Sequence, residues 1–427
     1  MKKVFLGADI MLPREDIDDA AWSVVACDQF TSEPEYWEAV EEIVGEKPST
    51  YRMILPEVYL EEPDAEQRIG KINQTMKDYI EEDVFVTYPD SMVYVERIDS
   101  TGKLRAGLVG KFDLEAYDYN RGSDSLIRAT EATVIERIPP RIKVRKNAEI
   151  EMPHIMILID DKKKTVIEPL GAKKEQLKKL YDFDMMQGGG HISGYLVEAD
   201  QQAEIFEALG ILSSRAYFDE QYGLPDKPIL LYAMGDGNHS LATAKEFYEQ
   251  LKAANPDRDM SNHPARYALA ELVNLHSDAL EFEAIHRILT DVDADALFAA
   301  MTEALGLEKI DSAAVTADMQ AFRKMLKGEV EDYVITKPTS KLTVGSLQMF
   351  LDKYLKENGG KIDYIHGEDV VKNLSMQDNS IGFLLTVMGK EELYPSVIVD
   401  GALPRKTFSM GHAEDKRYYM ECRKITE

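Results

Sequence analysis

Cysteine is scarce in this sequence of 427 residues, which has only Cys27 and Cys422, at opposite ends of the chain. No Cys-x-x-Cys pair occurs, and this excludes a zinc ribbon and a thioredoxin-type redox motif. So few cysteines favour a reducing compartment, and we therefore expect a cytoplasmic protein. Long apolar runs are lacking as well, since no stretch reaches the roughly 18 apolar residues of a membrane helix. Asp9 ends the N-terminal apolar run too early for a signal peptide.

Positive charge is in deficit. The chain has 50 Lys and Arg against 77 Asp and Glu, a formal charge of −27. Binding to nucleic acid or to an anionic membrane surface needs a basic face, so both partners are disfavoured. A local basic pocket for a small anion remains compatible with this balance. The expected partner is a small-molecule or phosphorylated ligand, and an oligomer is left open.

Several catalytic motifs are missing. There is no Gly-x-Ser-x-Gly elbow, no His-Glu-x-x-His pair and no Gly-Lys-Ser/Thr phosphate loop. These absences argue against an α/β-hydrolase, a histidine-based zinc enzyme and a Walker-type ATPase. The run Gly188–Gly190 is compatible with an anion-binding nest, a mobile lid or a plain flexible loop.

The order of the predicted elements indicates the fold class. Strands and helices alternate, but the turn Asp99–Gly102 between two predicted strands indicates that hairpins occur too. We therefore predict an α+β fold with mixed sheets and packed helices. Helices are predicted at residues 172–181 and 316–326, among others. Weak composition shifts suggest three regions, at residues 1–165, 166–280 and 281–427.

One segment could carry chemistry. The apolar residues 229–234 run into Gly235–His239, and helical spacing follows from Ser240. A strand, a glycine turn and a helix point backbone N–H groups of Gly237, Asn238 and Ser240 at a phosphate or carboxylate. Asp236 could hold Mg²⁺ or act as a base, and His239 could contact phosphate or shuttle a proton. The competing interpretation is a structural turn in which Asn238 or Ser240 only caps the helix.

This segment resembles the Asp-Gly-His-His-Arg-x-x-Thr-Ala motif of the domain of unknown function 1015 family. A related short motif marks the ParB-like and free serine kinase proteins. Three further segments match that family in order: residues 51–57, residues 110–133 and residues 403–408. The resemblance implies a strand–glycine turn–helix unit like that of the ParB-like and serine kinase proteins. The chain departs from the family motifs at Asn238, Ser240 and Thr130, where the family has His, Arg and His.

The resemblance also implies a function. It suggests a Mg²⁺-dependent phosphotransferase that uses ATP or ADP and a small-metabolite acceptor, with Glu131, Asp236 and His239 as catalytic residues and Asp236 near the metal. Arg128, Thr133 and Lys406 would join the turn in binding phosphate. The alternatives are a non-catalytic nucleotide or metabolite sensor or adaptor, and a family member that has lost its chemistry.

A basic group lies close to the matched segments. Arg128, Arg137, Arg141, Lys143 and Arg145 are concentrated in an otherwise acidic chain. They could hold a phosphorylated ligand. Alternatively, they form a solvated surface whose ion pairs contribute little.

Overall fold

Two compact units make up the chain. The computed structural model describes residues 3–31, 33–152, 154–316, 318–411 and 413–427. The first unit contains Met1–Ala129, Thr133–Leu280 and Gly411–Glu427, and the second contains Thr130–Ala132 and Glu281–Met410. This division differs from the three regions suggested by composition, because strands on both sides of residue 165 share one sheet.

An eleven-stranded sheet organises the first unit, in the order β5-β6-β11-β8-β12-β4-β3-β10-β9 with β1 on β4 and β2 on β3. Three neighbouring pairs are parallel (β5 with β6, β6 with β11 and β8 with β12), so the sheet is mixed. Its strands are β1 (Phe5–Leu6), β2 (Ala8–Pro13), β3 (Phe85–Ile98), β4 (Leu104–Asp113), β5 (Tyr117–Asp118), β6 (Ile127–Arg128), β8 (Met156–Ile159), β9 (Lys178–Asp184), β10 (His191–Val197), β11 (Tyr232–Asp236) and β12 (Tyr267–Asn274).

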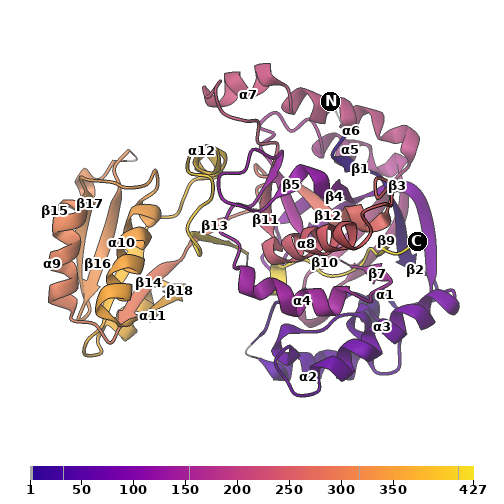
Figure 1. Ribbon diagram of the computed structural model, residues 1–427, viewed down its shortest axis with the longest axis horizontal. Helices are drawn as coiled ribbons and strands as arrows, with labels where there is room; N and C mark the ends of the chain where they lie inside the picture. Colours follow the sequence, from indigo (N-terminus) through magenta and orange to yellow (C-terminus); the bar gives the residue numbers. More distant parts are fainter. Residues whose placement is uncertain (1–2, 32, 153, 317, 412) are drawn as a thin grey trace. The chain divides into compact units, whose positions relative to one another are not determined.

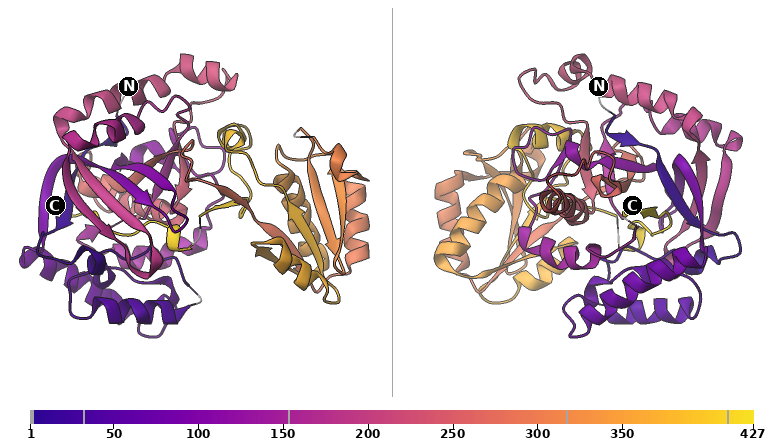
Figure 2. Two further views of the ribbon diagram at one scale, coloured as in Figure 1. Left: turned by 180° about the vertical axis from the view of Figure 1, so that it is seen from behind. Right: turned by 45° about the vertical axis from the view of Figure 1, so that its right-hand side comes forward.

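Helices cover both faces of this sheet (Figures 1 and 2). One buried core joins the sheet to α5, α6 and α8, and the other joins it to α1, α2, α3 and the C-terminal residues. The helices of the unit are α1 (Asp19–Trp22), α2 (Pro34–Val44), α3 (Ala65–Glu81), α4 (Ile138–Arg145), α5 (Glu168–Lys173), α6 (Ala203–Leu212), α7 (Arg215–Tyr222) and α8 (Asn238–Ala254).

The C-terminal residues return to the first unit after the chain has formed the second. Strand β21 (Arg423–Lys424) pairs with β7 (Ile150–Glu151), and the backbone of Cys422 forms an isolated antiparallel β-bridge with Met11. Sequence periodicity alone gives no signal for this long-range return. It brings residues 413–421 onto the α1–α3 side of the sheet, where Tyr418 and Tyr419 join the core.

An antiparallel six-stranded sheet, ordered β15-β17-β16-β19-β14-β18, forms the core of the second unit. Its strands are β14 (His286–Thr290), β15 (Leu307–Lys309), β16 (Ala321–Leu326), β17 (Glu329–Ile335), β18 (Lys361–Ile365) and β19 (Ile381–Leu385). The other elements are α9 (Ala294–Leu305), α10 (Thr343–Asn358), α11 (Glu368–Ser375), α12 (Lys390–Asp400) and the pair β13 (Phe282–Ala284) and β20 (Phe408–Met410).

The α+β class with mixed sheets is confirmed, and so is the hairpin at Asp99–Gly102, which joins β3 to β4. Two helix predictions are wrong. Residues 178–184 form β9, an edge strand paired with β10, and residues 321–326 form β16, between β17 and β19. Both segments contain good helix formers, but pairing with neighbouring strands overrides that weak preference. Residue 317 of the second prediction lies outside the described residues.

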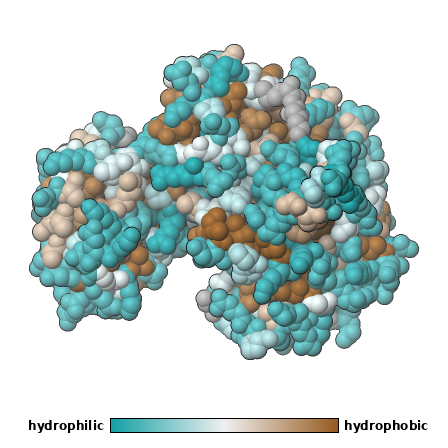
Figure 3. All heavy atoms as spheres, in the orientation of Figure 1, coloured by the Kyte–Doolittle hydropathy of each residue, from teal (hydrophilic) through white to brown (hydrophobic). Residues whose placement is uncertain are grey.

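In the part of the chain that the structure describes, no helix is both long and apolar enough to cross a membrane. The surface visible in Figure 3 is mainly hydrophilic on both units.

Candidate functional site

The turn between β11 and α8 is built around a glycine. Strand β11 ends at Asp236, Gly237 has a φ of 72°, and α8 begins at Asn238. A Cβ on Gly237 would lie 3.0 Å from Ile155 Cα, so the turn needs glycine both for its φ and for space. The predicted strand, turn and helix are therefore confirmed at this point. The first turn of α8 presents N–H groups that have no partner within the helix.

A buried histidine lies beside this turn. His154 Nε2 is 3.2 Å from Ser240 Oγ on the first turn of α8 and 3.4 Å from Asp28 Oδ2. Its Nδ1 is 2.8 Å from the Tyr419 hydroxyl, and the residue is only 6% exposed. The three contacts hold the ring in one orientation. Tyr419 belongs to the C-terminal residues, which are therefore part of the site.

Asp28 and His154 stabilise each other's charged forms. Burial would raise the pKa of Asp28, but the His154 imidazole and a hydrogen bond from Gln29 outweigh burial and hold that pKa well below its usual range. Burial would likewise lower the pKa of His154, but the charge of Asp28 and the bond to it raise that pKa above its ordinary value. The pair can thus hold a proton next to the first turn of α8.

Asp236 is held by the C-terminal residues too. Its Oδ1 accepts the Gly237 N–H at 2.8 Å, and its Oδ2 lies 3.1 Å from Lys416 Nζ. Lys416 also helps to lower the pKa of Asp28, so its ammonium acts on both carboxylates. In the described part of the chain, no three His, Cys, Asp or Glu side chains are arranged to hold a metal ion. For Asp236 Oδ2 to bind Mg²⁺, the cation would have to take the place of the Lys416 ammonium.

Two arginines of the basic group lie near His239. Helix α4 packs against α8, and burial followed by the charges of Arg141 and Arg137 lowers the pKa of His239 to about 4. His239 is therefore neutral at neutral pH. The Val134 N–H donates to His239 Nε2 at 3.3 Å, which leaves the ring proton on Nδ1. Arg141 forms an ion pair with Glu57.

The depressed pKa of His239 predicts a pH effect on stability. The unfolded chain binds the His239 proton below about pH 6.5, but the folded chain does so only near pH 4. The contribution of the neutral His239 to the free energy of unfolding is therefore fully present above pH 6.5 and is lost as the pH falls toward 4. Allowing for solvent screening, we expect about 1 kcal/mol of loss between about pH 7 and pH 5. Urea unfolding of wild type and His239→Gln checks this, because glutamine carries no such proton. An unchanged pH dependence in the variant would contradict it.

The remaining predicted site residues do not all gather at the turn. The Asn238 amide donates to Thr133 Oγ1 at 3.3 Å and accepts from Tyr117, so these residues do lie together. Arg128 is 3% exposed and uses its guanidinium on the carbonyls of Ser125, Pro228 and Ile229. That arrangement holds backbone segments together, and burial lowers the pKa of Arg128.

Glu131 and Lys406 belong to the second unit. The backbone amides of Lys406 and Thr407 bond to the Glu131 carboxylate, and burial outweighs these bonds and the Lys406 charge to raise the pKa of Glu131. Glu131 thus holds the segment that carries Lys406. Their roles in phosphate binding and catalysis stay predictions.

Sequence reasoning missed four residues that contact the turn directly or through His154: Asp28, His154, Lys416 and Tyr419. No metal-ligand or catalytic motif surrounds His154 in the sequence. Asp28 follows Cys27, whose sequence context indicates an unreactive thiol. Burial does raise the pKa of the Cys27 thiol to about 12. Lys416 and Tyr419 reach the site only through the return of the C-terminal residues, for which no local pattern is a signal.

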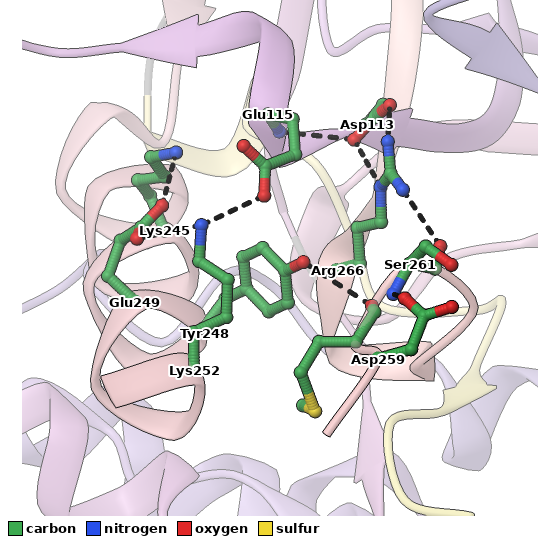
Figure 4. Close-up of polar contacts among 10 residues, drawn as sticks. Asp113, Glu115, Lys245, Tyr248, Glu249, Lys252, Asp259, Ser261 and Arg266 are labelled. Atoms are coloured by element: carbon green, nitrogen blue, oxygen red, sulfur yellow. Dashed lines mark hydrogen bonds and ion pairs between the residues drawn. The ribbon is translucent and has the colours of Figure 1, made fainter. Parts of the chain in front are cut away.

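A hollow lies at the end of α8 opposite the turn. It has a volume of about 480 Å³ and is lined by Glu115, Tyr248, Lys252, Asn255, Pro256, Arg258, Asp259, Met260, Ser261 and Arg266. Its cations are already paired: Lys252 with Glu115 and Arg266 with Asp113 (Figure 4), and Arg258 with Glu427. The turn at Asp236 has ion-paired cations too, but it adds the N-terminal N–H groups of α8 and the buried His154, so it is the better candidate site.

The chain is therefore an α+β protein, and its candidate site is the polar turn between strand β11 and helix α8. The chain belongs to the family described as Protein of unknown function (DUF1015), whose model matches residues 9–355. A search of curated proteins finds no match.

Several solved structures are similar to the chain at low identity. A free serine kinase variant in complex with AMP has 11% identity and a TM-score of 0.41 over 77% of this chain and 93% of its own. A conserved hypothetical protein from Pyrococcus furiosus has 12% identity and a TM-score of 0.37 over 74% of this chain and 94% of its own. SbnI from Staphylococcus aureus, truncated at its C-terminus, has 8% identity and a TM-score of 0.37 over 71% and 82%. Similarity at this level says nothing about the ligand or reaction of this chain.

Proposed function

We propose that the protein binds a nucleotide or other small phosphate compound at the first turn of α8 and transfers phosphate to a small metabolite. One observation carries the proposal. The buried pair Asp28–His154 lies 3.2 Å from Ser240 on a helix N-terminus, which combines a proton-holding group with an anion-binding geometry.

The cations near α8 support phosphate binding. The family motif has Arg at the position of Ser240, and that Arg would be a natural phosphate clamp. Here Arg137 and Arg141 of the neighbouring α4 segment act on His239 instead. The neutral His239 keeps a proton on Nδ1 that it can donate to a phosphate oxygen. Arg137, directly before α4, and Arg141, within α4, therefore supply the positive charge that position 240 lacks.

The chemistry follows from the same groups. In the proposed transfer, an acceptor hydroxyl oxygen forms a bond to phosphorus while the bond from phosphorus to the leaving oxygen breaks. The His154 imidazolium, which Asp28 keeps charged, donates its proton to the leaving oxygen, and the acceptor hydroxyl proton passes to water. Phosphoryl transfer depends mainly on positioning and charge neutralisation, which the helix N–H groups, Arg137 and Arg141 supply.

A non-catalytic sensor or adaptor is the second candidate. It is favoured by Glu131, the predicted base, whose carboxylate is bonded to backbone amides in the second unit. An enzyme consumes its phosphate donor when the acceptor is present, whereas a sensor only binds it. Turnover therefore separates the two, and a chain that has lost its ligand would show neither.

Thermal-shift and calorimetric titrations with ATP, ADP and inorganic phosphate test the proposal, followed by donor consumption with a panel of small hydroxyl compounds. Ligand at about 100 times its dissociation constant should stabilise the wild type by about 2.7 kcal/mol. We expect His154→Gln to retain binding and to lose turnover by about 10²- to 10⁴-fold. Arg258→Gln, at the far end of α8, serves as the matched control and should behave as wild type. Absence of any stabilisation by all three compounds would refute the proposal.

A further inference from the structure

The carboxylates at the turn are already neutralised by the protein itself. Lys416 Nζ is 3.1 Å from Asp236 Oδ2, and the Gly237 N–H occupies Oδ1. The carboxylate of Asp28 takes a hydrogen bond from Gln29 and the charge of His154. A divalent cation bound here would have to displace Lys416 from Asp236.

Lys416 is held in place from both sides. Arg97, 2% exposed, donates to the carbonyl oxygens of Lys416, Glu414 and Gly189. On the other side, the Arg417 guanidinium bonds to the buried Glu271 carboxylate at 2.6 Å. The main chain at Lys416 is thus anchored to the sheet, and its ammonium is presented at a fixed place.

The Lys416 side chain remains reachable. It is 18% exposed and that of Asp236 is 26% exposed, so a small ligand can approach the pair from solvent. An ammonium offers three donors and one positive charge, which suits a phosphate oxygen as well as a carboxylate.

We propose that Lys416 is the resident cation of this site and that the phosphate ligand binds without a divalent metal. This inference rests on the proposed function and narrows its ligand class to phosphate compounds that are not chelated to Mg²⁺, such as phosphomonoesters. It replaces the Mg²⁺ dependence expected from the family resemblance. Lys416 then bridges Asp236 and the bound phosphate, and the anchored main chain keeps it there.

Calorimetry with a nucleoside monophosphate and with inorganic phosphate, each in EDTA and in excess Mg²⁺, tests this inference on the full chain. In wild type we expect equal affinity in both buffers. Lys416→Met should weaken phosphate binding by about tenfold to a hundredfold, because a charged hydrogen-bond donor is lost. Lys416→Arg should retain most of the affinity. Lys173→Met, which removes a lysine 49% exposed on α5, is the matched control and should bind as wild type.

A second readout follows the metal alone. Mn²⁺ titrated without nucleotide should not bind to wild type, in which Lys416 holds Asp236 Oδ2. Phosphate binding by wild type only in the presence of Mg²⁺ would overturn this inference and leave the proposed function intact. Failure of every phosphate compound to bind in either buffer would instead refute the proposed function, and this inference with it.

Discussion

Replacing Arg417 by Met should destabilise the first unit by about 3–5 kcal/mol, because it leaves two buried carboxylates without their partner. Arg417 is 5% exposed and bonds to Glu271 and Glu421, which are 2% exposed or less. After the substitution, the nearest cation to Glu271 is Arg105, at 3.6 Å. Trp22 and Trp37 are the only tryptophans and both are buried in this unit, so denaturant unfolding followed by their fluorescence reports on it.

A matched control separates burial from charge pairing. Arg258 also pairs with a glutamate, Glu427, but the two side chains are 48% and 51% exposed. We expect Arg258→Met to cost no more than about 1 kcal/mol, since water screens the pair and solvates whichever partner remains. Similar small losses for both variants would show that the Glu271 cluster is solvated and would contradict the prediction.

Adding a single carbon to Gly237 should cost about 2 kcal/mol or more. Gly237→Ala forces a left-handed backbone on alanine and brings its Cβ to 3.0 Å from Ile155 Cα. Gly223, at the end of α7, has nearly the same backbone angles, with φ 64° and ψ 30° against 72° and 28°. No atom of the described residues lies within 4 Å of the position of its Cβ.

Gly223→Ala therefore measures only the loss of stability that comes from a left-handed backbone on alanine, which we expect to be about 1 kcal/mol. Thermal or urea unfolding of both variants gives the comparison, and phosphate titration of Gly237→Ala adds a functional measurement. The crowded variant should lose more stability, and it should also bind ligand more weakly because the first turn of α8 is displaced. Equal losses at the two glycines would mean that Ile155 moves away without cost.

Part of the site was predictable because its signal is local. The apolar run, the glycine and the helical spacing after Ser240 predict β11, the turn and α8, and all three are present. The ion pairs at the turn and the return of the C-terminal residues instead depend on contacts between residues that are distant in the sequence. Asp28, His154 and Lys416 lie far apart along the sequence, and only strand pairing and the C-terminal bridge at Cys422 bring them to the turn.

The failed predictions have the same origin. Residues 178–181 of the predicted helix include lysine and leucine, which are good helix formers, but β10 pairs with them antiparallel, with one register shift. Glu131 and Lys406 matched the family's motifs and do lie together, yet their contacts are with backbone in the second unit. A motif states which residue types are present and not what they face.

By itself the sequence determined the α+β class, the turn at Asp236–Ser240 and membership of a family of unknown function, because each depends on short-range order along the chain. Tertiary structure alone decided which charges meet. It placed the Arg128 guanidinium on backbone carbonyls and gave Asp236 an ammonium partner, because electrostatic contacts depend on distance in space. That distance is set by sheet order and by where the last residues of the chain return.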